Sequence, residues 1–83
     1  MVTASEVRHT HETMLEVAGR LVDEVQDVPP GVVLRAYWRA VRLVRNAGCP
    51  LPVLPDEAEL VARHLLLRRG VRVPHPRLGE QAG

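Results

Sequence analysis

Residues 27–48 have the sequence DVPPGVVLRAYWRAVRLVRNAG, and this stretch decides the fold. Pro29 and Pro30 cannot lie inside a helix but suit its first turn, because that turn needs no amide donor and the fixed φ of proline is already helical. Gly48 can adopt the left-handed conformation that ends a helix. Between these signals apolar residues recur at three- and four-residue steps, which predicts one amphipathic helix over residues 30–47.

The segment before this stretch predicts a first helix over residues 4–25. Thr3 and Glu6 fit a capping box, and Val2 and Val7 lie where a hydrophobic staple would form. Apolar residues then recur at helical spacing, with charged residues on the opposite side. The expected apolar stripe consists of Val7, Met14, Leu15, Ala18, Leu21, Val22 and Val25.

A third helix is expected over residues 55–69, after the proline-rich loop CPLPVLP. Its first turn carries Pro55 and several acidic residues, which suit the positive end of a helix dipole, and Gly70 follows as a stop. Beyond Gly70 the sequence has no periodicity and contains two prolines. We therefore expect an all-α fold, a three-helix bundle over residues 1–70 with a mobile tail over residues 71–83. The expected core includes Leu21, Val33, Ala40, Val44 and Leu65.

The composition narrows the class of protein. The chain has 83 residues, of which 46% are hydrophobic, with one Tyr, one Trp and no Phe, so we expect one small domain with an aliphatic core. Cys49 is the sole cysteine, which excludes an intrachain disulfide and favours a reducing cytoplasm. The start of the chain lacks the apolar stretch of a signal peptide, and no apolar run is long enough to span a membrane. A cytoplasmic protein that does not enter the membrane is expected.

Charge is distributed unevenly along the chain, although the net charge is only +1. Residues 1–27 carry six acidic residues and two arginines, which gives −4. Residues 28–55 carry four arginines and no acidic residue, which gives +4. Overall charge therefore selects no class of partner, but the individual segments can.

The second expected helix carries the main candidate for a contact surface. Arg35, Arg39 and Arg42 fall within about 60° of one another on a helical wheel, with Arg45 flanking them and Trp38 close to Arg42. A cation–π contact between Trp38 and Arg42 would be worth roughly 0.5–1 kcal/mol. This side could bind an acidic protein or nucleic-acid phosphates, or it could be a solvated helix surface. Domains that bind nucleic acid usually carry a much higher positive charge, so the net charge of +1 makes nucleic acid the less favoured partner.

Leu60 and Leu67 form a second candidate surface on the third expected helix. They lie away from the expected core stripe, so they could form a self-association seam or be covered by the PLPVLP loop or the tail. No set of residues predicts catalysis, a cofactor or a metal site. His9 and His11 point in different directions on a helix, and Cys49 has no predictable basic partner. We expect neither enzyme activity nor a small-molecule substrate.

Residues 20–41, RLVDEVQDVPPGVVLRAYWRAV, resemble the opening of small actinobacterial three-helix-bundle dimerisation domains. In those domains an amphipathic helix leads through an acidic turn with Val-Pro-Pro into an Ala-rich helix, and the use of arginine without lysine here fits an actinobacterial source. The order of helix, turn and helix is also similar, more faintly, to ubiquitin-associated and CUE-type modules. Val25 and Gln26 stand where those patterns have an aromatic residue and a proline. The resemblance implies a protein-interaction fold without catalysis.

The sequence therefore predicts a non-enzymatic protein-interaction or self-association module. Its partner would be another protein or a second copy of the chain. The alternative is a small DNA-binding regulator that places the same arginines on phosphates. The expected contact residues are Arg35, Trp38, Arg39, Arg42, Arg45, Leu60 and Leu67.

Overall fold

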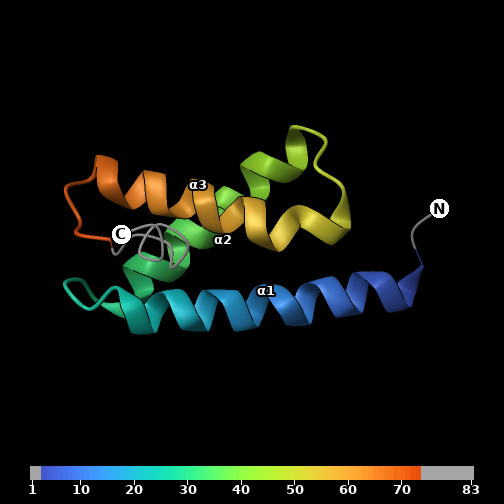
Figure 1. Ribbon diagram of the computed structural model, residues 1–83, viewed down its shortest axis with the longest axis horizontal. Helices are drawn as coiled ribbons and strands as arrows, with labels where there is room; N and C mark the ends of the chain where they lie inside the picture. Colours follow the sequence, from blue (N-terminus) through green and yellow to red (C-terminus); the bar gives the residue numbers. More distant parts are fainter. Residues whose placement is uncertain (1–2, 74–83) are drawn as a thin grey trace, which may run out of the picture.

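The computed structural model describes residues 3–73, and Figure 1 shows three helices packed side by side. Helix α1 spans Ala4–Glu24, α2 spans Pro30–Asn46, and α3 spans Leu54–Arg68 after the short 3-10 helix η1, Leu51–Val53. The described residues contain no strand, so the predicted all-α three-helix fold is confirmed. Each helix boundary lies within one residue of its predicted position.

The helices begin where the local sequence can satisfy or dispense with the free backbone amides. The Thr3 hydroxyl accepts a hydrogen bond from the backbone N–H of Glu6 at 3.1 Å, which caps α1. At the start of α2, Pro29 is the cap residue and Pro30 occupies the first turn, so no side-chain cap forms there. Pro55 has the same place in the first turn of α3.

The helices α2 and α3 end in the same way. Gly48 has φ of 92°, and its N–H donates to the carbonyl of Arg45 at 3.0 Å, while the N–H of Cys49 donates to the carbonyl of Val44 at 3.2 Å. This pair of bonds is a Schellman motif, which needs a residue in the left-handed region and therefore favours glycine. Gly70, with φ of 84°, ends α3 through the equivalent bonds.

The core lies between the three helices and is aliphatic except for one aromatic ring. Tyr37 is the largest fully buried side chain, and its hydroxyl donates to the carbonyl of Pro55 at 3.3 Å, which ties α2 to the first turn of α3. The buried hydrophobic residues are Val17, Ala18, Leu21, Val25, Val33, Ala36, Tyr37, Ala40, Val41, Leu54, Ala58, Ala62 and Leu66.

The predicted stripe on α1 is wrong at two positions. Val7 and Leu15 keep 51% and 50% of their surface exposed, whereas Thr10 and Val17 are buried. The N-terminal end of this long helix projects past the other two helices (Figure 1), and Val7 near that end stays half-exposed. Leu15 lies on the flank of α1 beside α2 rather than on the side that faces the core.

Two predicted core residues lie at the edge of the core. Leu21, Val33 and Ala40 are fully buried as expected, while Val44 and Leu65 are half-buried and pack against the core from outside. Beyond Gly70 the chain continues along the bundle, since Val71 and Val73 also pack against the core. The rest of the predicted tail, residues 74–83, and the staple residue Val2 lie outside the described residues.

Candidate functional site

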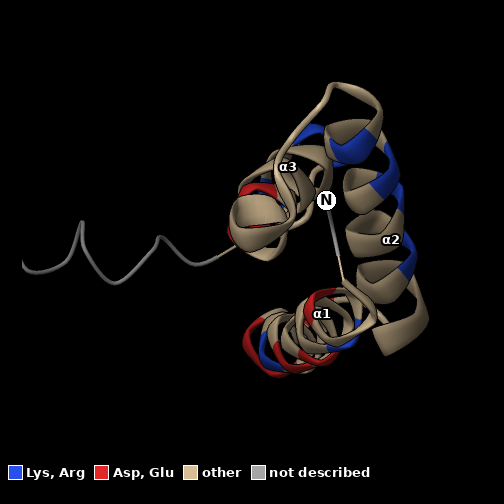
Figure 2. Ribbon diagram, turned by 90° about the vertical axis from the view of Figure 1, so that its right-hand side faces the viewer, with Lys and Arg blue, Asp and Glu red and all other residues tan. Residues whose placement is uncertain are grey.

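The four arginines of the candidate surface lie on α2 and point to solvent. Arg35, Arg39, Arg42 and Arg45 are all exposed, and Figure 2 shows basic residues following the outer side of α2. Among residues 3–73, none of the four forms an ion pair or a side-chain hydrogen bond. Four guanidinium groups on one helix therefore keep all their donors available for a partner.

Trp38 is half-buried at the contact between α1 and α2. Its ring meets that of Tyr37 edge-on, with 5.4 Å between ring centroids and an interplanar angle of 76°. It also stacks on His11 of α1, with 6.3 Å between centroids and an angle of 25°. The expected cation–π contact with Arg42 does not form among the described residues. Trp38 thus helps to hold α1 against α2, and its remaining exposed part borders the arginines.

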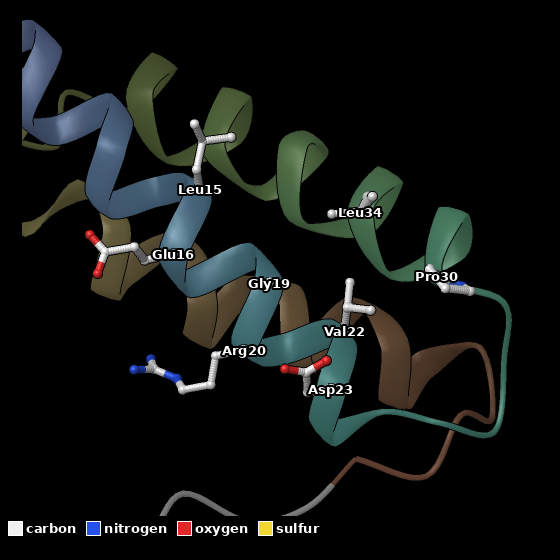
Figure 3. Close-up of a pocket in the computed structure, with 8 residues that line it drawn as sticks. All are labelled: Leu15, Glu16, Gly19, Arg20, Val22, Asp23, Pro30 and Leu34. Carbon is white, nitrogen blue, oxygen red and sulfur yellow. The ribbon is translucent and has the colours of Figure 1, made fainter.

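A shallow groove of about 650 Å³ lies between α1 and α2, close to this aromatic contact, and no residue of α3 lines it. Its apolar lining comes from Leu15, Gly19 and Val22 of α1 and from Pro30 and Leu34 of α2 (Figure 3). Leu15 and Leu34 retain 50% and 36% of their surface exposed. The sequence analysis did not identify this groove, because Leu15 was placed in the core and Leu34 in no site.

The two borders of the groove carry opposite charge. Glu16, Arg20 and Asp23 lie on the α1 side of the lining, and all three are exposed, but Arg20 is paired with Glu59 of α3. On α2, Arg35 and Arg42 follow Leu34 and Trp38 around the helix at successive steps of the helical wheel. Figure 2 shows mainly acidic residues on α1, with some basic residues among them, and basic residues along the outer side of α2. An apolar strip therefore runs between an acidic edge and a basic edge.

The second predicted surface stands on a different helix. Leu60 and Leu67 each keep 55% of their surface exposed, on the side of α3 opposite the buried stripe. Among the described residues neither η1 nor another segment buries them, so the alternative that the PLPVLP loop covers them is wrong. The alternative that the tail covers them involves residues 74–83, which lie outside the described residues. The structure does not bring these leucines together with the arginines of α2 into one site.

A second groove lies at the opposite end of the bundle, where α2 passes into η1 and α3. Its volume is about 470 Å³, and the lining is apolar except for Glu57. The thiol of Cys49 lies at this groove and donates to the carbonyl of Pro50 at 3.6 Å. No charge borders this groove in a way that would indicate the chemistry of an occupant.

An ionic network joins α1 to α3, and the sequence analysis missed it. Arg63 is only 7% exposed, and its Nη2 atom lies 2.6 Å from Glu24 Oε2 and 2.7 Å from Glu59 Oε2. Arg20 of α1 reaches the other oxygen of Glu59 at 2.8 Å. Burial alone would lower the pKa of Arg63, but the hydrogen bonds that it donates to Glu59 and Glu24 and the charges of both carboxylates raise it above its usual value.

Glu24 is not merely a solvated charge at the end of α1. Its carboxylate holds the buried Arg63 from the end of α1, and one third of its side chain remains exposed. Glu24 and Arg63 are 39 residues apart in sequence, so no local pattern could pair them. The network is structural, because nothing in it lies at the groove apart from Arg20.

Within residues 3–73, no cluster of three His, Cys, Asp or Glu side chains has the spacing to bind a metal ion. No helix in that part of the chain is long and apolar enough to cross a membrane. His75, the fourth histidine, lies outside the described residues. Comparison of the chain with protein-family models, curated proteins and solved structures finds no match, so its function has to be inferred from its own residues.

Proposed function

We propose that this chain is a non-enzymatic protein-interaction module of the cytoplasm whose contact surface is the arginine side of α2 together with Trp38. The observation that carries the proposal is the set of four exposed guanidinium groups on one helix, none of them paired with a described residue. The complementary partner is a protein surface rich in carboxylates, because arginine binds carboxylates in a bidentate, directional way.

Trp38 supports the same surface. A half-buried tryptophan beside arginines has the composition typical of interface residues that contribute most to binding. Its ring is already held by His11 and Tyr37, so little conformational entropy would be lost when a partner covers it. The arginines around it would mainly set the orientation and the rate of association.

The second candidate function is that of a small DNA-binding regulator. The same four arginines favour it, because phosphates are also ligands of guanidinium groups. Against it stands the net charge of +1 and the acidic outer side of α1 (Figure 2), which would repel a DNA duplex lying across both helices.

The two functions can be separated by fluorescence titration, since Trp38 is the only tryptophan in the chain. Poly-glutamate and a short DNA duplex would serve as probes, with the parent protein and the double variant Arg39→Glu, Arg42→Glu. Arg68→Glu on α3 is the control, because Arg68 is also exposed but lies on another helix. We expect poly-glutamate to change the Trp38 emission, and the double reversal to weaken this binding at least about tenfold.

The control variant should bind poly-glutamate like the parent. Tighter binding of the DNA duplex than of poly-glutamate, with an affinity that falls steeply as salt is raised, would favour the regulator instead. If the double reversal stays folded, binds both probes like the parent and self-associates like the parent in sedimentation, the arginine side is only a solvated surface and the proposal is wrong.

A further inference from the structure

We infer that the groove over Gly19 is a self-association surface, in which α1 of one copy packs on α2 of a second copy around a twofold axis that runs along the groove. This inference rests on the proposed function and names the partner: the acidic surface that meets the arginines is α1 of another copy. Three observations carry it, namely the apolar strip, the glycine at its floor and the opposite charge of its two edges.

The charges of the edges identify the occupant. The α1 side of the lining carries Glu16 and Asp23 together with Arg20, whose charge is paired with Glu59 of α3, and Arg35 follows the lining residue Leu34 on α2. A complementary partner therefore places basic groups near Glu16 and Asp23 and acidic groups near Arg35. A twofold rotation about an axis along the groove exchanges the two edges, so the acidic edge of each copy faces the basic edge of the other. The surface is therefore complementary to itself, as an isologous interface requires. A twofold axis across the groove would instead set acid against acid.

This packing gives a reason for the presence of a glycine at position 19. Glycine inside a helix costs about 1 kcal/mol relative to alanine, yet a Cβ atom at Gly19 would meet no atom within 4 Å. Nothing within the described part of the chain therefore requires a glycine there. The missing Cβ leaves room between Leu15 and Val22 for a side chain of a second copy (Figure 3). Leu34, which lines the same groove from α2 and is partly exposed, has the size to fill this hollow in the facing copy.

Two pairs of residues show how α1 and α2 are aligned along the groove: His11 stacks on Trp38, and Leu15 and Leu34 line the same groove. Glu16 follows Leu15 on α1 and Arg35 follows Leu34 on α2, so the helical register places the two charges near the same level of the groove. A twofold rotation about an axis along the groove does not change the position of a residue along the groove. Glu16 of each copy therefore meets Arg35 of the other copy, and the contact occurs twice.

The test is sedimentation velocity over a wide concentration series, with unfolding curves measured on the same samples. Gly19→Gln should leave the isolated fold at least as stable as the parent, because glutamine is the better helix former and the site is open. The same variant should weaken self-association at least about tenfold, because its side chain fills the hollow. Leu60→Gln on α3 is the matched control and should associate like the parent.

A charge swap tests whether the partner is a second copy. Glu16→Arg and Arg35→Glu should each weaken association several-fold, because each places like charges together, and the double variant should recover most of the parent affinity. Recovery in the double variant cannot occur if the groove binds a different protein.

Three results would overturn the inference: a parent that stays monomeric at every concentration, a dimer that is insensitive to Gly19→Gln, or a dimer that is broken by Leu60→Gln instead. The proposed function would survive each of them if poly-glutamate binding still depends on Arg39 and Arg42. Loss of that dependence would count against the proposed function itself.

Discussion

At the scale of single residues, the polar groups inside the bundle decide how it responds to its surroundings. Tyr37 brings a hydroxyl into an otherwise aliphatic core, and Arg63 brings a charge to the contact between α1 and α3. Both are satisfied, the first by the Pro55 carbonyl and the second by Glu24 and Glu59. Buried polar groups cost free energy when a partner is removed, so these two residues should be sensitive to both pH and substitution.

The first prediction concerns alkaline pH. Burial, together with the negative charges of Glu59 and Asp56 and partly offset by Arg20, raises the pKa of Tyr37 from 10.0 to about 12. The fold thus favours the protonated phenol, and the resulting stability is fully present below pH 10 and is lost as pH rises from 10 towards 12. The difference corresponds to about 2–3 kcal/mol of unfolding free energy.

Urea unfolding measured at increasing alkaline pH checks this, with tyrosinate absorbance followed in parallel. The chain has no lysine and a single tyrosine, so the loss can be assigned to one group. Tyr37→Phe is the control: it should be less stable at neutral pH, because the Pro55 carbonyl loses its donor, but its stability should fall less between pH 10 and 12. A parent whose pH dependence matches that of Tyr37→Phe would contradict the prediction.

The second prediction concerns Arg63. Replacing it with alanine should lower the unfolding free energy by roughly 2–3 kcal/mol, because two carboxylates then lose their shared cation at a partly buried site. Arg20→Ala should cost less than about 1 kcal/mol, since the Arg20 side chain is 56% exposed and its ion pair is screened by solvent. Thermal and urea unfolding of both variants measure the difference, and equal losses would mean that burial of Arg63 contributes nothing.

At the scale of elements, each helix is predictable because the residues that end it and the spacing of its apolar residues are found within its own stretch of sequence. Thr3, Pro30 and Gly48 each determine a boundary through their own backbone or hydroxyl, so the boundaries could be predicted within one residue. The local sequence does not determine which other segment packs against a given side of a helix. Leu15 has the spacing of a core residue, but α3 does not reach that flank of α1, so it faces the groove instead.

The candidate site was predictable in part for the same reason. The arginines of α2 lie opposite its own buried stripe, so the sequence alone could place them in solvent. The groove could not be predicted, because its lining comes from two helices whose contact depends on the packing of His11 against Trp38. The pairing of Glu24 with Arg63 is equally long-range.

The third prediction tests the rotational position of α3 with two adjacent leucines. Leu66 is fully buried and Leu67 is 55% exposed. Leu66→Ala should therefore cost about 2–5 kcal/mol, which is enough to unfold much of a domain this small, whereas Leu67→Ala should cost less than about 1 kcal/mol. Circular dichroism during thermal unfolding measures both. Similar losses in the two variants would mean that α3 is rotated or that Leu67 is covered in solution.

At the scale of the whole molecule, the three helices are not packed equally closely against one another. α2 and α3 pack most closely with each other, and Tyr37 links them by its hydrogen bond to Pro55. α1 lies against both, but its buried apolar residues, Val17 among them, are confined to its C-terminal half, and its N-terminal end projects beyond the bundle (Figure 1). Stability should therefore vary along the molecule rather than be uniform.

The fourth prediction is the order of amide hydrogen exchange. Amides in the middle of α2 and α3, near Ala40 and Ala62, should be protected by the full unfolding free energy, because only global unfolding exposes them. Amides of α1 before Thr10 should exchange fastest among the helical residues, since those turns can fray without opening the core. Exchange followed by NMR in dilute protein measures this order.

The same experiment links local stability to assembly. If a second copy covers the groove, raising the protein concentration should slow exchange in α1 around Gly19 and in α2 around Leu34, while amides beside Leu60 on α3 stay unchanged, because only the first two positions line the groove. Gly19→Gln should abolish the concentration dependence without altering the order seen in dilute protein. Protection that rises equally in all three helices would mean that association stabilises the fold as a whole, and protection that rises only in α3 would place the contact at Leu60 and Leu67.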